Sequence, residues 1–354
     1  MEKRIGSRKS SWALFSGKII IGIFLISIAG MNISCKGGQK KADDPETKIE
    51  AEVQVAENPF ITHMYTADPS ARVWEDGRLY IYASHDIAPP KGCDLMDRYH
   101  VFSTDDMVNW TDHGEILRSE QVPWGRPEGG FMWAPDCVYK NGTYYFYFPH
   151  PSDTEWNNSW KIGVATSKYP DRDFTVQGYI KGLESLIDPT VFVDDDGQAY
   201  IYHGGGARCM AGKLKDNMME IDGEMMVIEG LEDFHEAPWI HKRNGVYYLS
   251  YSDNHDDNWN DGVKGDNRMR YAISNSPLGP WECKGIYMEP TNSYTNHGSI
   301  VEYKGQWYSF YHDSSLSEAN GEFNDWLRSV CVDKLYYNED GTIQMVKQTK
   351  SWKP

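Results

Sequence analysis

The stretch from Asp188 to Gly204 reads DPTVFVDDDGQAYIYHG, and it decides the fold. An Asp-Gly pair at residues 196–197 separates two short runs rich in β-branched and aromatic residues, which favour strands. Asp-Gly favours a tight hairpin turn, because glycine adopts positive φ without steric cost. The stretch therefore predicts a β-hairpin.

The same pattern occurs five times along the chain. The other turn glycines precede aromatic-rich runs: Gly77 before RLYIYAS, Gly142 before TYYFYF, Gly245 before VYYLSYS and Gly305 before QWYSFYH. The segments before the five turns start at Asp68, Ala134, Asp188, Glu236 and His297, with spacings of 66, 54, 48 and 61 residues by subtraction. A repeat of this length with several strands per unit is typical of a β-propeller. A β-sandwich or barrel also has evenly spaced hairpins, but the regular phase favours an all-β fold, a five-bladed β-propeller with about four strands per blade.

Composition limits the partners. The chain has 354 residues, of which 40% are hydrophobic, and its formal net charge is −17. Ordinary globular composition argues against a disordered or fibrous chain. A chain this acidic is repelled by phosphate backbones, so we expect no nucleic-acid partner.

The N-terminus predicts export. A basic region is followed by an apolar run, Ile19 to Ala29, that is too short to span a bilayer comfortably. Ser34-Cys35 then resembles a bacterial lipoprotein signal, in which the cysteine is lipidated; an ordinary cleaved signal peptide is the alternative. We therefore predict a signal peptide over residues 1–35, a polar tether over 36–57 and one propeller domain over 58–354. The protein would be a periplasmic or cell-surface lipoprotein anchored to the membrane.

Ionisable residues recur where the first strand of each blade begins. In a propeller these strands line the axis, so Asp68, Asp188, Glu236 and His297 should converge at one end of it. Asp and Glu are rarely buried without a partner, so four such residues in register are hard to explain structurally. Clustered carboxylates suit glycosidic hydrolysis, which needs a base to activate water and an acid to protonate the leaving oxygen. A third carboxylate raises the pKa of the acid by like-charge repulsion.

These residues also lie in motifs that resemble those of glycoside hydrolase family 43. The motifs are Ala67-Asp68-Pro69, Trp133-Ala134-Pro135-Asp136, the run from Asp188 to Gly197, Glu236-Ala237-Pro238 and His297-Gly298. They occur in the family's order and cover nearly the whole chain after the tether. Ala237 replaces the more usual glycine.

The resemblance implies a role for each residue. Asp68 would be the general base and Glu236 the general acid, while Asp188 would orient the acid and tune its pKa. His297 would lie deeper on the axis, near a bound cation, often calcium. Arg328 would contact the sugar in the subsite that is cleaved, although an ordinary surface salt bridge is an equal alternative.

Three aromatic residues, Trp133, Phe131 and Trp74, are candidates for stacking on the sugar, with core packing as the alternative. By strand alternation we expect His235 to point away from the axis. Gly204-Gly205-Gly206 precedes no helix pattern and no HExxH motif occurs, so we expect no organic cofactor and no zinc-protease site.

The function implied is inverting hydrolysis that releases terminal α-L-arabinofuranosyl or β-D-xylosyl units from plant cell-wall polysaccharides or oligosaccharides. Galactan-directed and endo-arabinan-directed hydrolases of the same fold remain alternatives, and so does a non-catalytic glycan-binding propeller. A retaining fructan hydrolase would show Arg-Asp-Pro and Glu-Cys motifs, but here Ile187 precedes Asp188 and Ala237 follows Glu236.

Overall fold

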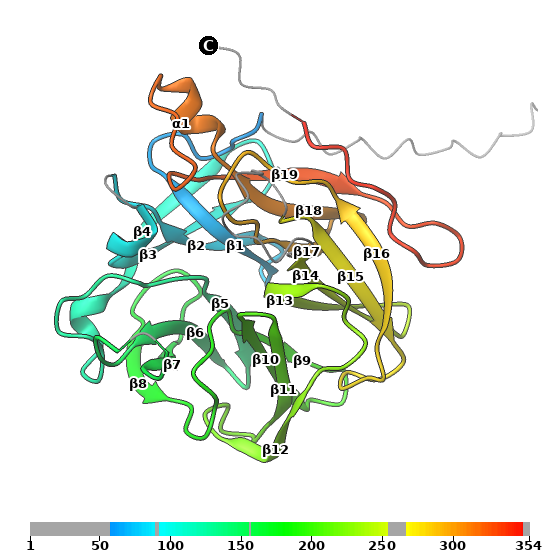
Figure 1. The fold of residues 1–354 in the computed structure, drawn as a ribbon, viewed down its shortest axis with the longest axis horizontal. Coiled ribbons are helices and arrows are strands. Elements are labelled where there is room, and N and C mark those ends of the chain that lie inside the picture. The colour runs from blue at the N-terminus through cyan, green and yellow to red at the C-terminus, as the bar shows by residue number, and fades with distance from the viewer. Residues whose placement is uncertain (1–56, 89–91, 156, 254–266, 350–354) are drawn as a thin grey trace, which may run out of the picture. The chain divides into compact units, whose positions relative to one another are not determined.

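The computed structural model describes residues 57–88, 92–155, 157–253 and 267–349, and these form five antiparallel sheets around one axis (Figure 1). The first strands of neighbouring sheets contact one another in a closed ring, β1 to β5, β5 to β9, β9 to β13, β13 to β17 and β17 to β1. The prediction of an all-β, five-bladed β-propeller is therefore confirmed. The predicted signal peptide, Cys35 and residues 36–56 of the tether lie outside the described residues.

The blades follow one another in chain order, and each is built from consecutive strands. The strands are β1 (Thr66–Val73), β2 (Leu79–His85), β3 (Arg98–Thr104), β4 (Trp110–Arg118), β5 (Asp136–Lys140), β6 (Thr143–Pro151), β7 (Trp160–Ser167), β8 (Thr175–Tyr179), β9 (Thr190–Val193), β10 (Ala199–Gly205), β11 (Arg208–Leu214), β12 (Ile221–Val227), β13 (Phe234–Arg243), β14 (Val246–Asp253), β15 (Met269–Ser274), β16 (Glu282–Met288), β17 (Ser299–Tyr303), β18 (Gln306–Asp313) and β19 (Ser329–Leu335). One short helix, α1 (Ser315–Ala319), and two 3₁₀ turns, Gly92–Leu95 and Ser119–Gln121, complete the regular structure of the described residues. None of the helices in these ranges is long and apolar enough to cross a membrane.

All five predicted turn glycines connect the first two strands of a blade, with φ between 76° and 84°. Three of the turns are two-residue loops, since Lys140 pairs with Thr143, Arg243 with Val246 and Tyr303 with Gln306. The two Asp-Gly turns are longer, because Val73 pairs with Leu79 and Val193 with Ala199. The hairpins are as predicted, and two of the five turns are wider than the dipeptide suggests.

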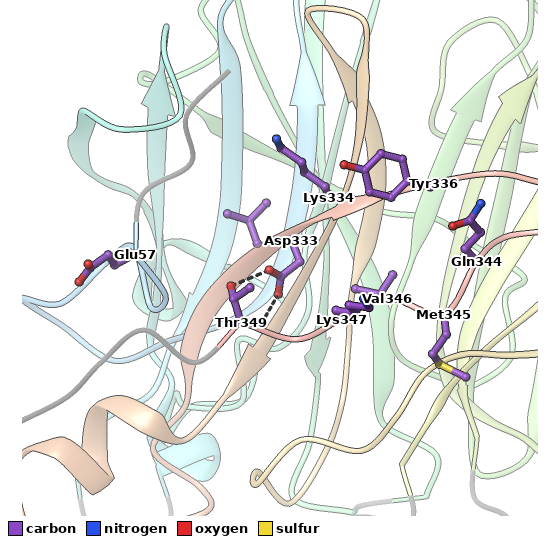
Figure 2. A pocket seen from close by; sticks show the side chains of 10 residues that line it. Glu57, Asp333, Lys334, Tyr336, Gln344, Met345, Val346, Lys347 and Thr349 are labelled. Carbon is purple, nitrogen blue, oxygen red and sulfur yellow. Dashed lines mark hydrogen bonds between the residues drawn. The ribbon is translucent and has the colours of Figure 1, made fainter. Parts of the chain in front are cut away.

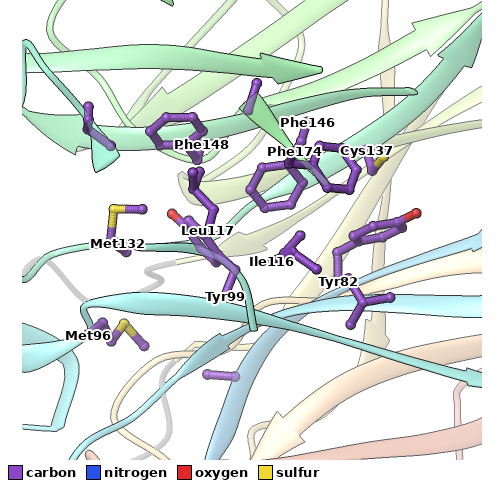
Figure 3. Close-up of a cluster of buried hydrophobic side chains, with 14 of the residues drawn as sticks. Tyr82, Met96, Tyr99, Ile116, Leu117, Met132, Cys137, Phe146, Phe148 and Phe174 are labelled. Carbon is purple, nitrogen blue, oxygen red and sulfur yellow. The ribbon is translucent and has the colours of Figure 1, made fainter. Parts of the chain in front are cut away.

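The alternating aromatics fill the spaces between blades. Successive side chains of a strand point to opposite faces, so Tyr80 and Tyr82 of β2 pack toward the second blade, while Ile81 and Ala83 pack toward the fifth. Figure 3 shows the cluster between the first two blades, where Tyr82 and Tyr99 lie with Phe146 and Phe148. Each of the five buried clusters lies between two neighbouring blades. This packing fixes the inner strands and therefore the side chains at their ends.

The fifth blade departs from the predicted four strands. It has three, and the N-terminal segment before β1 lies along its last strand instead. The side-chain amide of Asn58 donates to the Val332 carbonyl at 3.0 Å and accepts from the Val332 N–H at 2.9 Å. The N–H groups of Phe60 and Thr66 donate to carbonyls of the same strand region. The ring is thus closed by residues that precede the first blade.

Candidate active site

Three predicted carboxylates lie together in one cavity of about 390 Å³. Asp68 belongs to β1, Asp188 precedes β9, and Glu236 belongs to β13, so they come from the first, third and fourth blades. The residues that line the cavity are Asp68, Cys93, Trp133, Ala134, Ile187, Asp188, Gly206, His235, Glu236, Tyr294, Thr295, His297, Trp326 and Arg328. The structure therefore brings together the three carboxylates and His297, as the repeat predicts, and also Arg328, as the family resemblance implies.

The backbone leaves the regular strand where the carboxylates are presented. Asp68 and Asp188 have φ of 53° and 52°, a left-handed conformation that non-glycine residues rarely adopt. Each stands directly before a proline, and β1 has a register shift between Ala67 and Ser70. Such bulges re-aim a side chain, and left-handed residues of this kind cluster at functional sites.

Glu236 is offset from the predicted phase by one residue. Ala237, not Glu236, stands directly before a proline, and Ala237 has the left-handed φ of 60°. Glu236 still lines the cavity, and the ladder shifts register on both sides of it. The same irregularity breaks the expected alternation, because His235 also lines the cavity and its Nε2 lies 3.6 Å from Oε2 of Glu236. The expectation that His235 points away was wrong.

Asp68 is held in its ionised form. The hydroxyl of Ser84 donates to its Oδ2 at 2.7 Å, and Nη1 of Arg328 donates to its Oδ1 at 3.2 Å. Burial is the largest single influence and raises the pKa of Asp68, but Arg328, the nearby imidazoles and the Ser84 hydrogen bond together lower it, and the net pKa lies below the usual 3.8. An ionised carboxylate at neutral pH is the form that a general base requires.

His312 supports Asp68 as a neutral group. Burial lowers the pKa of His312 to about 3, so the ring is uncharged at neutral pH. Its Nδ1 accepts the backbone N–H of Asp68 at 3.1 Å, which places the ring proton on Nε2, 2.9 Å from the Thr295 carbonyl oxygen. Arg328 is therefore the cation that acts on Asp68.

Arg328 is buried, so the alternative of a surface salt bridge was wrong. Its Nε and Nη2 donate to the two carboxylate oxygens of Asp86, each at 2.9 Å, and Nη1 also donates to the Thr295 hydroxyl at 2.9 Å. A bidentate pair of this kind fixes the guanidinium geometrically. Asp86 thus positions the arginine that contacts Asp68.

Asp188 is the carboxylate with the raised pKa. Burial raises the pKa of Asp188 well above its usual value, and the negative charges of Glu236 and Asp68 raise it further. Its Oδ2 accepts the N–H of Ala237 at 3.0 Å, which ties it to the residue next to Glu236. The like-charge repulsion that was predicted to act on the acid is resolved at Asp188 instead, where it favours the protonated form.

His297 lies between two carboxylates. Its Nδ1 is 3.9 Å from Oδ1 of Asp68 and 3.8 Å from Oδ2 of Asp188. Burial lowers the pKa of His297, so the ring is largely neutral at neutral pH. Within the described ranges, no three or more His, Cys, Asp and Glu side chains form a group that could hold a metal ion.

The three aromatic candidates lie in three different places. Trp133 lines the carboxylate cavity, and its Nε1 donates to the Cys93 carbonyl at 2.8 Å. Phe131 lines a neighbouring surface cavity instead. Trp74 follows the far end of β1 and packs against Tyr82 and Tyr144 in the core between the first two blades, so it lies outside the site.

Two aromatic residues of the site were missed. Tyr294 and Trp326 line the cavity, and their rings stack with centroids 4.1 Å apart. Tyr294 lies in the connection from β16 to β17 and Trp326 in that from β18 to β19, both outside the repeated hairpins. No repeat singles them out, and neither does it single out Asp86 or His312.

Cavity size does not identify the site. A larger cavity of about 550 Å³ lies between β19 and the chain that follows it (Figure 2). Its lining includes Asp333, whose carboxylate accepts the Thr349 hydroxyl at 2.6 Å. None of the predicted catalytic residues lines this cavity, so the convergence of carboxylates marks the smaller one.

Comparison with known proteins gives consistent results. A family model described as "Glycosyl hydrolases family 43" matches residues 56–343. A xylosidase/arabinosidase 43A of Humicola insolens is 39% identical over 342 residues, which cover 80% of this chain and 98% of that protein. A xylosidase/arabinosidase of Bacteroides ovatus is 36% identical and covers 79% and 94%. The crystal structure of a family 43 β-xylosidase/α-arabinofuranosidase from a compost metagenome, in complex with xylotriose, superposes with a TM-score of 0.70 at 36% identity, over 82% of this chain and 96% of that one.

Proposed function

The chain belongs to glycosyl hydrolases family 43 and is a glycosidase, and from this premise we propose that it releases terminal α-L-arabinofuranosyl or β-D-xylosyl units with inversion. The observation that carries the proposal is one cavity with three carboxylates in different electrostatic environments. The pKa of Asp68 is lowered against the effect of burial by Arg328 together with neighbouring imidazoles and the Ser84 hydroxyl, while burial and like charges raise the pKa of Asp188. A site that keeps one carboxylate ionised and favours a proton on another can run acid and base chemistry at one pH.

The roles that we propose are those that the family resemblance implies. Asp68 takes a proton from a water molecule as that water attacks the anomeric carbon. Glu236, with 16% of its side chain exposed to the cavity, donates a proton to the leaving oxygen. Asp188 accepts the Ala237 N–H and so orients the neighbouring acid, and like-charge repulsion disfavours simultaneous ionisation of Asp188 and Glu236. Arg328 contacts Asp68 and lines the same cavity, where the sugar would bind.

The choice of sugar rests on the relatives. Proteins 39% and 36% identical to this chain are named xylosidase/arabinosidase, which supports terminal pentose units. A protein of Aspergillus niger that is 29% identical is named β-D-galactofuranosidase, so a galactose-directed activity is a second candidate. Initial rates on 4-nitrophenyl α-L-arabinofuranoside, β-D-xyloside and β-D-galactofuranoside test the proposal. Rates on the galactofuranoside alone, or on none of the three, would contradict it.

Inversion has its own test. Proton NMR of the first product formed should show the anomer opposite to that of the substrate. A first product that keeps the substrate's anomeric configuration would rule out the inverting mechanism.

Calcium near His297 stays a prediction. Ca²⁺ prefers about six to eight oxygen ligands, and among the described residues no three or more His, Cys, Asp and Glu side chains gather to hold a metal ion. A cation there would therefore depend on water for most of its ligands, and we assign it no catalytic step. Thermal unfolding with added calcium or with a chelator tests binding, and an unchanged midpoint would count against it.

We also propose that Cys35 carries a lipid that anchors the protein to a membrane, on the basis of the signal-like sequence alone. Cys35→Ala should release the protein into the soluble fraction of the cells that make it. Unchanged retention in the membrane fraction would contradict the anchor.

A further inference from the structure

A second cavity of about 300 Å³, here called the outer cavity, adjoins the carboxylate cavity. The two share Trp133, Ile187 and Gly206, so they form one continuous depression. The remaining lining of the outer cavity comes from the second and third blades, including the first residues of β7 and β11. An oligosaccharide whose terminal unit lies at the carboxylates would therefore place its next units close to the outer cavity.

Two packed tryptophan side chains form one side of the outer cavity. The ring of Trp133 packs on that of Trp160, with centroids 4.7 Å apart, and the indole Nε1 of Trp133 is tied to the Cys93 carbonyl. The N–H of Trp160 donates to the Ser185 hydroxyl at 3.1 Å. Gly206 lies at the boundary between the two cavities and has no side chain to obstruct it. A Cβ at this position would meet no atom within 4 Å, so the space beside Gly206 is open. Flat apolar faces beside polar groups are the surfaces that pack against sugar rings.

The rim of the outer cavity carries one ion pair. Nη1 of Arg208 lies 2.8 Å from Oε2 of Glu184, and both side chains are about half exposed, at 48% and 43%. A guanidinium has five N–H donors and a carboxylate has about four acceptor sites, so the pair retains capacity to bind hydroxyl groups. Its charges cancel, which suits a neutral sugar better than an acidic one.

We propose that the outer cavity binds the sugar units on the leaving-group side of the cleaved bond, and that Arg208 and Glu184 select neutral oligosaccharides longer than a disaccharide. The inference rests on the proposed function, because it takes the carboxylate cavity as the place where the terminal unit is cleaved. It adds the class of substrate: a neutral chain rather than a small glycoside or an acidic branch.

Substrates of increasing length test the inference. We would measure kcat/KM for the disaccharide, trisaccharide and tetrasaccharide of xylose and of α-1,5-linked arabinose. In Arg208→Ala, the ratio of kcat/KM for the tetrasaccharide to that for the disaccharide should fall about tenfold, the scale of one hydrogen bond to a charged group. Lys215→Ala is the matched control, since Lys215, which directly follows the other end of β11, forms a similarly exposed pair with Glu220; its ratio should equal that of the wild type.

Glu184→Gln gives a second readout that a merely structural role would not move. The substitution leaves the charge of Arg208 uncompensated, so kcat/KM for a xylo-oligosaccharide bearing glucuronic acid should rise relative to that for the neutral one. An unchanged preference would show that the pair does not read the charge of the sugar.

The outcomes separate the inference from the proposed function. If the enzyme cleaves aryl pentosides but Arg208→Ala keeps the wild-type length ratio, the inference is overturned and the function stands. If no pentoside is cleaved, the function fails, and calorimetry in the Glu236→Gln background then tests the cavity alone. Binding of xylotetraose about tenfold weaker after Arg208→Ala supports the outer cavity, and equal binding overturns it.

Discussion

Asp136 and Asp188 are both buried carboxylates at the inner strands of the propeller, and their surroundings differ in kind. Asp136 accepts hydrogen bonds from two hydroxyls, two backbone N–H groups and the guanidinium of Arg72. The donors are Ser70 Oγ, Arg72 Nε, Arg72 Nη2, Cys137 N, Thr190 Oγ1 and Val191 N. Asp188 accepts the Ala237 N–H, lies 3.8 Å from Nδ1 of His297, and faces the negative charges of Glu236 and Asp68.

The difference separates structure from chemistry. A carboxylate with a full set of donors is locked in place and ties its neighbours together, and Asp136 joins the first three blades in this way. A carboxylate placed among like charges has a pKa that responds to them and can take part in proton transfer. The catalytic assignment therefore depends on what surrounds each aspartate, and the comparison can be broken by experiment.

The largest effect should come from Asp68→Asn. The substitution removes the base that activates water, so kcat/KM should fall about 10²–10⁴-fold on natural glycosides and on aryl glycosides alike. The free energy of unfolding should change little, since Arg328 keeps its bidentate pair with Asp86. Steady-state rates and urea denaturation measure the two quantities. A loss of stability with unchanged rates would show that Asp68 has a structural role like that of Asp136.

Glu236→Ala should show dependence on the leaving group. Loss of the acid should cost about 10²–10⁴-fold on natural glycosides and much less on an aryl glycoside, whose phenol departs without a proton. The effect is measured from hydrolysis rates of a series of aryl glycosides whose phenol leaving groups differ in acidity. If Asp68→Asn shows this dependence and Glu236→Ala does not, the roles of acid and base are reversed.

Asp136→Asn should have the opposite effect to Asp68→Asn: a loss of stability with little change in rate. Removing one partner of a buried ion pair leaves Arg72 uncompensated and costs about 3–5 kcal/mol of unfolding free energy. The folded fraction should keep a kcat near that of the wild type. Asp216→Ala is the control, because this pair with Lys140 is fully exposed on the aspartate side, at 99%, and should contribute little. Equal stability of the two variants would contradict the structural role.

Asp188→Asn should produce the smallest effect and act through pH. A carboxyl whose folded-state pKa is raised stabilises the fold at low pH, and this stability is lost as pH rises above about 4, the unfolded value, through the folded pKa. The wild type should therefore lose stability over that window, and the variant should not. The alkaline limb of the pH–rate profile should also move to lower pH, because Glu236 would then ionise without a second ionisable carboxyl beside it. Identical pH–stability and pH–rate profiles for the wild type and the variant would show that Asp188 takes no part in proton transfer.

The repeat predicted most of the fold because each blade carries its own local signal. The turn glycines and alternating aromatics determine hairpins that need no distant information, as at Gly142 and Gly245. The exception is the fifth blade, where Asn58 and its neighbours lie along β19. No pattern in residues 58–66 indicates a partner more than 260 residues away.

The site was predictable only where it follows the repeat. Asp68, Asp188 and His297 lie at equivalent starts of inner strands, and Glu236 is displaced by one residue, which alignment on Pro238 would have revealed. Asp86 and His312 act through Arg328 and the backbone of Asp68, contacts that form only when the ring closes. Residue type and spacing carry no information about such contacts.

Ring closure also sets the order in which this enzyme can become active. Arg328 reaches Asp68 across 260 residues of sequence, and His312 reaches it across 244. Contacts this distant form late, because the chain between their ends must first lose its loop entropy. A ribosome that has released the first four blades has already exposed all three carboxylates. It has not yet supplied His297 and Arg328, which line the same cavity, so the site is complete only when the last blade has been synthesised.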